Sequence, residues 1–270
     1  MKENSTRPEG ATTVQSRLER ERQHYNNRAE RVSNDSLQMP AWNIERYRTP
    51  SATTEFPLEY AFHLMGNLEG KTVVDLGCGD GLNTVVLAAL GAKVFSVDIS
   101  DKSLEVTHQR TIANGVAHNV RLIHSDAARI PIDDALADRV LCAAILHHVD
   151  ALAAANQIRR VLKSGGIAVF EEPMAGPDWL GPIKHWLPKN PEATEDEQPL
   201  TLDQVQAVSR QVGRHGRSRY FGLLSRITDR FHVRSIHNLR RIHRLDAGLL
   251  KTFTFASAFA SPLVWEATRE

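Results

Sequence analysis

Short apolar runs alternate with longer segments of mixed polarity through the middle of the chain. Runs that suit buried strands lie at 71–76, 93–98, 120–124, 137–144 and 166–171. Segments with helical length and composition lie between them, at 82–90, 103–114 and 152–162. Because strands that alternate with helices form β-α-β units, the pattern predicts an α/β fold, a parallel sheet with helices on both faces.

The segments on either side of this pattern are different. Polar residues 1–13 suit a disordered start, 14–32 a helix, and the proline-containing stretch 33–57 an aromatic-bearing loop. A short helix should follow at about 58–67, and a last strand is expected at 263–268. We therefore divide the chain into three parts: an N-terminal helical and aromatic lid segment (1–57), a ligand-binding core (58–173), and a helical insertion with the final strand (174–270).

The first predicted strand runs directly into the glycine-rich turn Asp75-Leu76-Gly77-Cys78-Gly79-Asp80-Gly81. Glycines allow a tight turn and a close approach of the backbone to a ligand, and such a turn at the carboxyl end of a strand is where open α/β sheets bind ligands. The dinucleotide fingerprint G-x-G-x-x-G would need a glycine at position 82, which is Leu82. A phosphate-binding loop of the Walker type is also absent, since no Gly-Lys-Ser/Thr follows.

Acidic residues follow the ends of three successive predicted strands. Asp75 precedes the glycines, Asp98 ends the second strand, and Asp126 follows the third in Ser125-Asp126-Ala127. A carboxylate at the position of Asp98 can accept hydrogen bonds from both hydroxyls of a ribose. Negative charge at the turn suits a cationic amino acid better than a pyrophosphate. Helix capping is the alternative role for Asp98 and Asp126.

These motifs, together with Leu162-Lys163-Ser164-Gly165-Gly166, resemble those of class I S-adenosylmethionine-dependent methyltransferases, in the small-molecule branch that includes the menaquinone/ubiquinone-type and "type 11" enzymes. The resemblance covers residues 70–173. It implies a Rossmann-like, seven-stranded, mostly parallel sheet and S-adenosylmethionine as cofactor. The residues that it implies as cofactor-binding are Asp75, Gly77, Cys78, Gly79, Asp98, Ile99, Asp126, Ala127 and Ala143.

The resemblance also implies the reaction, methyl transfer to a small-molecule acceptor at oxygen or nitrogen in specialised or cofactor metabolism. Methyl transfer is an in-line displacement, so positioning can supply much of the rate acceleration. Candidate catalytic groups follow the fourth and fifth strands. His147 and His148 are candidates for a base, and one carboxylate of Glu171-Glu172, with Glu172 as the catalytic candidate, could contact an acceptor amine or hydroxyl. Packing against the cofactor is the alternative for the histidines, and a salt bridge or cap for Glu172.

Three aromatic residues of the lid segment, Tyr25, Trp42 and Tyr47, are candidates for contacting the acceptor, with packing of a loop onto the sheet as the alternative. The histidine pair alone does not make a metal site, so no metal is expected. Cys78 and Cys142 are the only two cysteines, which favours a reducing cytoplasm. The chain also lacks the long apolar stretch that a membrane-spanning helix needs, and the run 253–264 suits core or a homodimer contact.

Charge is balanced overall at +1, which gives no general reason to expect nucleic acid as a partner. The exception is 210–251, where ten arginines and one lysine stand against two aspartates. A solvated helix face is the simplest explanation, and an anionic acceptor held by arginines is the next. Two alternative functions remain open: an RNA-directed methyltransferase that uses this segment, and a catalytically silent cofactor-binding partner protein.

Overall fold

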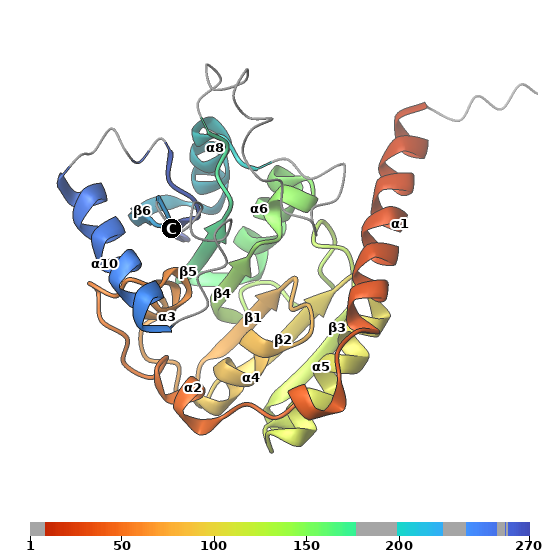
Figure 1. The fold of residues 1–270 in the computed structure, drawn as a ribbon. Coiled ribbons are helices and arrows are strands. Elements are labelled where there is room, and N and C mark those ends of the chain that lie inside the picture. Colours follow the sequence, from red (N-terminus) through yellow and green to blue (C-terminus); the bar gives the residue numbers. More distant parts are fainter. Residues whose placement is uncertain (1–8, 177–198, 224–235, 253–256, 258) are drawn as a thin grey trace, which may run out of the picture.

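A computed structural model describes residues 9–176, 199–223, 236–252, 257 and 259–270 (Figure 1). Its centre is a sheet of seven strands in the order β3-β2-β1-β4-β5-β7-β6. The strands are β1 (Thr72–Leu76), β2 (Lys93–Asp98), β3 (Val120–His124), β4 (Ala137–Ala143), β5 (Leu162–Glu172), β6 (Arg214–Tyr220) and β7 (Leu263–Thr268). Strands β1 to β5 pair in parallel, and β7 is antiparallel to both β5 and β6. The predicted Rossmann-like sheet is confirmed.

Helices cover both faces of this sheet, which explains why its central strands are apolar on both sides. Helices α3 (Pro57–Met65) and α4 (Leu82–Ala89) pack on one face, where their apolar side chains meet Val73, Leu141 and Val169. Helices α6 (Ala151–Val161) and α8 (Leu202–Val212) pack on the other face, around Val140 and Phe170. Helix α5 (Asp101–Ala113) lies against β2 and β3.

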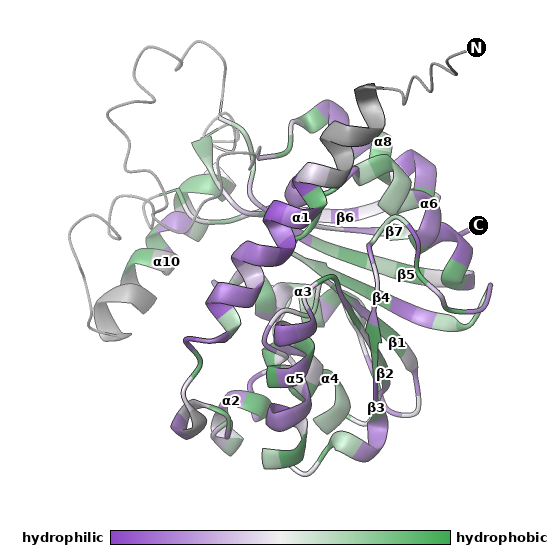
Figure 2. Ribbon diagram, turned by 90° about the vertical axis from the view of Figure 1, so that its right-hand side faces the viewer, coloured by the Kyte–Doolittle hydropathy of each residue, from purple (hydrophilic) through white to green (hydrophobic). Residues whose placement is uncertain are grey.

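The N-terminal helix α1 (Glu9–Ala29) crosses the edge of the sheet and contacts α5 (Figures 1 and 2). It is mostly hydrophilic, in contrast to the apolar strands behind it (Figure 2). The remaining described elements are η1 (Asn34–Ser36), α2 (Ala41–Glu45), η2 (Ala117–Asn119), η3 (Leu146–His148) and α10 (Ile236–Thr252). The polar sequence of α1 therefore folds against the domain through a limited set of contacts.

Local sequence signals explain several element boundaries. Ser100 begins α5 by accepting a hydrogen bond from the amide of Ser103, and Asp150 caps α6 in the same way. Thr201 and Gln204 form a reciprocal capping box at the start of α8. Gly91 follows α4 with a φ of +89°, the left-handed conformation that commonly ends a helix.

Four sequence expectations need correction. Helix α1 begins at Glu9, so only 1–8 of the expected disordered start lies outside the described residues. The segment expected as a loop, 33–57, contains η1 and α2. Strand β5 begins at Leu162, earlier than predicted. The insertion expected to be helical contains β6, whose sequence, Arg-His-Gly-Arg-Ser-Arg-Tyr, is mostly exposed at the edge of the sheet and so lacks an apolar alternation.

Candidate functional site

A cavity of about 580 Å³ opens where the parallel strands end. Its lining includes the glycine turn after β1 and the residues that follow β2, β3, β4 and β5. Residues of α1 and α2, which come from far earlier in the chain, complete the wall. Because the carboxyl ends of parallel strands face one crevice, the fold gathers these segments at one place.

The glycine turn needs glycine for two different reasons. Gly77 has a φ of +72°, and a Cβ on it would come within 2.8 Å of the Ile145 side chain. Gly81 has a φ of +83°, and a Cβ there would meet Thr107 at 2.7 Å. Gly79 is different, because its φ of +54° is left-handed but the space beside it is open. Gly79 lines the cavity, and a Cβ on it would point into open space.

Asp98, at the end of β2, ties the turn to the neighbouring strand. Its Oδ2 accepts a hydrogen bond from the amide of Gly79 at 2.9 Å, and its Oδ1 accepts one from Ser100 at 2.8 Å. The side chain lines the cavity although the residue is only 8% exposed. Burial raises the pKa of Asp98, while the amides of Ser100 and Gly79 oppose that rise. A carboxylate fixed in this way keeps lone pairs for a ligand's hydroxyls.

Asp75 does not line the cavity, which corrects the expectation that it lies beside the ligand. It is 1% exposed and accepts a hydrogen bond from the Thr84 hydroxyl at 2.6 Å beneath the turn. Burial raises its pKa to about 7, opposed by the Thr84 hydrogen bond and reinforced by the charge of Asp98. Its position inside the strand end therefore favours a structural role in holding the start of α4.

The other residues implied as cofactor-binding lie along the wall in the order of their strands. Ile99 follows Asp98, Asp126 and Ala127 follow β3, and Ala143 ends β4. Asp126 accepts a hydrogen bond from the amide of Ala128 at 3.0 Å. Cys78 lines the cavity as a free, buried thiol, and burial raises its pKa well above the usual range, so it is not a nucleophile at neutral pH.

Both histidines of η3 line the cavity, and each is held by a carboxylate. Nδ1 of His147 lies 2.7 Å from Oε2 of Glu172, and Nδ1 of His148 lies 3.1 Å from Oε2 of Glu21 in α1. Nε2 of His148 shares a hydrogen bond of 2.9 Å with the hydroxyl of Tyr25, also in α1. The two imidazole centroids are 4.0 Å apart. This arrangement orients both rings, and a base at His148 would act together with Tyr25.

Glu172 lies behind the wall of the cavity. It is fully buried, and its Oε1 accepts hydrogen bonds from the amides of Ile145 at 2.9 Å and Leu146 at 2.7 Å. With its other oxygen on His147, the carboxylate has no place for an acceptor, so the expectation of direct contact is corrected. The geometry favours the salt-bridge and capping alternative. The neighbouring Glu171 lines the cavity instead.

Two of the three aromatic candidates line the cavity. Tyr25 and Tyr47 line the cavity, whereas Trp42 is 70% exposed and does not, so its assignment to the acceptor site is corrected. Trp42 and Tyr47 share a segment with little regular periodicity, and sequence alone did not show which ring would face inward. Burial raises the pKa of Tyr47, so its phenol stays neutral.

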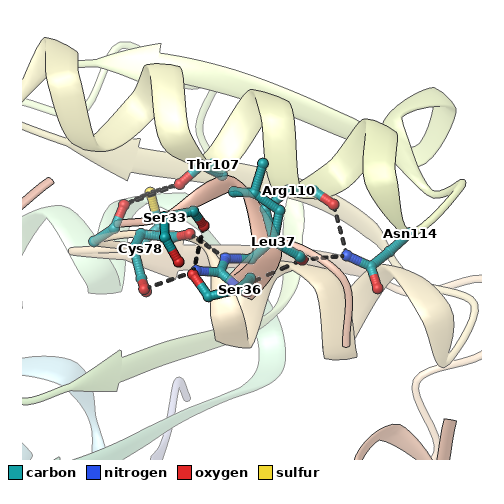
Figure 3. Close-up of polar contacts among 9 residues, drawn as sticks. Ser33, Ser36, Leu37, Cys78, Thr107, Arg110 and Asn114 are labelled. Atoms are coloured by element: carbon teal, nitrogen blue, oxygen red, sulfur yellow. Dashed lines mark hydrogen bonds and ion pairs between the residues drawn. The ribbon is translucent and has the colours of Figure 1, made fainter. Parts of the chain in front are cut away.

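A buried arginine that sequence reasoning missed connects the turn to the segment after α1 (Figure 3). Arg110 of α5 is 3% exposed and donates to the carbonyl of Asp80 at 2.8 Å, to its carboxylate at 3.0 Å and to the carbonyl of Ser36 at 2.7 Å. Asn114, one helical turn later, donates to the carbonyl of Leu37 at 2.9 Å. The sequence signal for this role was an arginine at a helix position that is buried in the fold. Through these contacts α5 acts as a clamp that holds the glycine turn and the segment after α1 together.

Three of the described arginines of 210–251 have partners away from the cavity. Arg217 pairs with Glu266 at 2.8 Å, Arg244 pairs with Glu55 at 3.1 Å, and Arg219 lies over the ring of Phe221. None of the arginines that can be placed in this segment lines the cavity. The part 224–235 lies outside the described residues.

Comparison with known proteins explains the site. Residues 74–170 match the family described as a methyltransferase domain. The matched residues include the glycine turn and the ends of β2, β3 and β4, which line the cavity. Over 114 residues it is 35% identical to the ubiquinone biosynthesis O-methyltransferase of Nitrosomonas europaea, a match that covers 42% of this chain and 48% of that enzyme. The chain thus spans about half the length of the curated relative that it matches.

Solved structures resemble the methyltransferase domain at the level of the fold. Geranyl diphosphate C-methyltransferase from Streptomyces coelicolor A3(2), solved with Mg²⁺, geranyl diphosphate and S-adenosyl-L-homocysteine, is 16% identical with a TM-score of 0.57, over 78% of each chain. The [4+2]-cyclase SpnF is 16% identical with a TM-score of 0.52, over 74% of this chain and 75% of that one. One fold therefore serves different reactions, and the reaction has to be argued from the site.

No group of three or more histidine, cysteine, aspartate or glutamate side chains among the described residues is arranged to hold a metal ion. Within the same residues, no helix combines the length and the apolar character needed to cross a membrane.

Proposed function

We propose that this chain transfers the methyl group of S-adenosylmethionine to a small-molecule acceptor. The observation that supports this most strongly is the order of the groups along the cavity. Asp126 and Ala127 lie at the end of β3, Asp98 at the end of β2 and the glycine turn at the end of β1. Since these strands are neighbours in the sheet, the three groups form a continuous path of the kind that an extended nucleoside needs.

The residues present fit this cofactor. Asp98 would hold the ribose hydroxyls, Asp126 and Ala127 with Ile99 would border the adenine, and Gly77 to Gly79 with Ala143 would border the methionine part. When bound, S-adenosylmethionine supplies a methyl group on a positively charged sulfur, which a nucleophile displaces. Carboxylates dominate the charged lining of the cavity, which suits a cationic ligand.

The protein's own residues would contribute mainly by orientation and by excluding water. Helix α1 forms a lid in this proposal, because Glu21 and Tyr25 close over His148, and Asn26 accepts a hydrogen bond from Ser100 at 2.6 Å. With Nδ1 of His148 facing the Glu21 carboxylate, Nε2 is free to accept the phenolic proton of Tyr25. Tyr25 and His148 can thus pass a proton away from an acceptor, while Glu172 positions His147.

The alternatives gain no support. An RNA-directed enzyme would use arginines of 210–251, but those that can be placed have protein partners or lie away from the cavity. The same arginines were the candidates for binding an anionic acceptor. None of those that can be placed lines the cavity near the ends of β4 and β5. A homodimer and a cytoplasmic location stay predictions.

The experiment is a screen of fractionated metabolite pools for release of S-adenosylhomocysteine by the purified chain. If the proposed function is correct, wild type should release S-adenosylhomocysteine with at least one fraction, and Asp98→Ala should release it with none. Binding of S-adenosylmethionine without release in any fraction would instead favour the catalytically silent partner.

A further inference from the structure

The order of the strands divides the cavity into two halves. The groups proposed for the cofactor lie at the ends of β3, β2 and β1, and the next strands in the sheet are β4 and then β5. Neighbouring strands are about 4.8 Å apart, so the end of β5 lies about two strand spacings beyond the glycine turn. The cavity continues to this point, where Glu171, Tyr47 and Pro173 line it. The acceptor therefore belongs at the end of β5.

Glu171 is the ionisable group of β5 at this end of the cavity. It alternates with its buried neighbour Glu172, so the two carboxylates leave opposite faces of the sheet. Glu171 is half-buried and lines the cavity, as Tyr47 does. Burial is the main cause of the raised pKa of Tyr47, and the charge of Glu171 adds to it.

The other acids of the lining all have partners. Glu21 faces His148, Asp80 pairs with Arg110, and Asp98 and Asp126 accept hydrogen bonds from backbone amides. For the side chain of Glu171, no residue that the structure describes supplies a hydrogen bond or an ion pair. The guanidinium of Arg46, which lies over the ring of Tyr47, is engaged by Glu59. A half-buried carboxylate that faces a cavity without a partner is a site for a cation or a donor from a ligand.

We propose that Glu171 binds an ammonium group of the acceptor, and that the acceptor is therefore an amine. This rests on the proposed function, because it takes the ends of β1 to β3 as the cofactor's part of the cavity. The carboxylate of Glu171 would repel a phosphate or carboxylate group at the same place. Little positive charge is available to offset this repulsion, since Arg28 of α1 is the one arginine or lysine among the described lining residues. Glu171 is a specificity-determining residue in this proposal.

The titration of Glu171 gives the proposal a second readout. Burial, and then the charge of Glu172, raise the pKa of Glu171 to about 7. Tyr47 also lines this part of the cavity, and the charged groups that act on it besides Glu171 are Arg46, which follows α2, and Glu59 of α3. An ammonium favours the ionised carboxylate, so its affinity should fall as the pH drops through 7.

A matched pair of probes tests this without knowledge of the acceptor. Benzylammonium and benzoate have similar size and opposite charge, and each is titrated into protein saturated with S-adenosylhomocysteine. We expect wild type to bind benzylammonium but not benzoate, with an affinity about tenfold lower at pH 6 than at pH 8. Glu171→Gln should weaken benzylammonium binding at least tenfold at pH 8 and remove its pH dependence. Glu105→Gln, on the exposed side of α5, is the matched control and should behave as wild type.

Three results would overturn the proposal: no benzylammonium binding by wild type, benzoate binding of equal strength, or benzylammonium binding by Glu171→Gln within twofold of wild type. Titration of S-adenosylhomocysteine alone separates this failure from a larger one. If wild type and Glu171→Gln both bind it, only the acceptor assignment is lost. If wild type does not bind it, the proposed function fails as well.

Discussion

The two halves of the cavity are built from contacts of very different range. In the cofactor half, the amide of Gly79 meets Asp98, 19 residues away, and its carbonyl meets Thr107, 28 residues away. In the acceptor half, the hydroxyl of Tyr25 meets His148 across 123 residues. The first two contacts lie within consecutive β-α-β units, whereas the contact of Tyr25 with His148 forms only when α1 docks on the domain. The two halves should therefore respond separately to substitution.

The largest effect is expected in the acceptor half, on turnover alone. Tyr25→Phe and His148→Gln should each lower the rate of S-adenosylhomocysteine release about 100-fold, because either change breaks the proton path between the two side chains. Cofactor affinity should stay within about threefold, as measured by calorimetry. His108→Gln, on the exposed surface of α5, is the control. Full turnover in both variants would remove the base and leave methyl transfer by positioning alone.

The next effect belongs to the cofactor half. Asp98→Ala should lower the affinity for S-adenosylmethionine about 100-fold, since it removes a charged acceptor for the ligand and the tie to Gly79. Calorimetric titration measures this, with Glu105→Ala as the matched acidic control on α5. An affinity within twofold of wild type would show that Asp98 does not hold the ribose.

Arg110 joins the glycine turn to the segment after α1, so its replacement should affect both stability and cofactor binding. Arg110→Met leaves the carbonyls of Asp80 and Ser36 and the Asp80 carboxylate without their donor, and should lower the free energy of unfolding by about 3 kcal/mol. Cofactor affinity should fall about fivefold as the turn loosens. Denaturant unfolding and calorimetry measure the two effects. Unchanged stability would mean that the clamp contributes little.

A smaller effect depends on pH and on Asp75. The pKa of Asp75 in the folded chain is about 7, above its value in the unfolded chain. Between these two pKa values the folded state holds a proton that the unfolded state has lost. The free energy of unfolding therefore falls as pH rises from about 4 to 7 and is level above that. Asp75→Asn keeps an oxygen for the Thr84 hydroxyl but cannot ionise. We expect it to exceed wild type in stability by about 2 kcal/mol at pH 8, with a smaller difference at pH 5. An equal difference at both pH values would show that Asp75 does not titrate in the fold.

The sequence predicts the cofactor half well because each of its features has a local cause. Apolar runs predict the five parallel strands, β1 to β5, and their order along the chain, and β2, β3 and β7 have the predicted bounds. Strand β6 was missed because an exposed edge strand of arginines and a glycine has no apolar face to detect.

The acceptor half was predicted only in part, for a physical reason. Sequence indicated His147, His148 and Tyr25 as candidates, but their partners Glu172 and Glu21 depend on which side of a strand or helix meets a distant segment. Adjacent positions of a strand then lie on opposite faces of the sheet: Glu172 points into the core and Glu171 into the cavity. Trp42 is exposed and Tyr47 lines the cavity. Their segment does not predict this difference, because α2, which holds Trp42 and ends just before Tyr47, is too short to show an amphipathic period.

Titration of S-adenosylmethionine into the wild-type chain tests the central claim most directly. We predict one binding site per chain with a dissociation constant in the micromolar range, about 1–100 μM, near the usual KM values of enzymes. Absence of binding heat together with an unchanged melting temperature at millimolar S-adenosylmethionine would contradict the account.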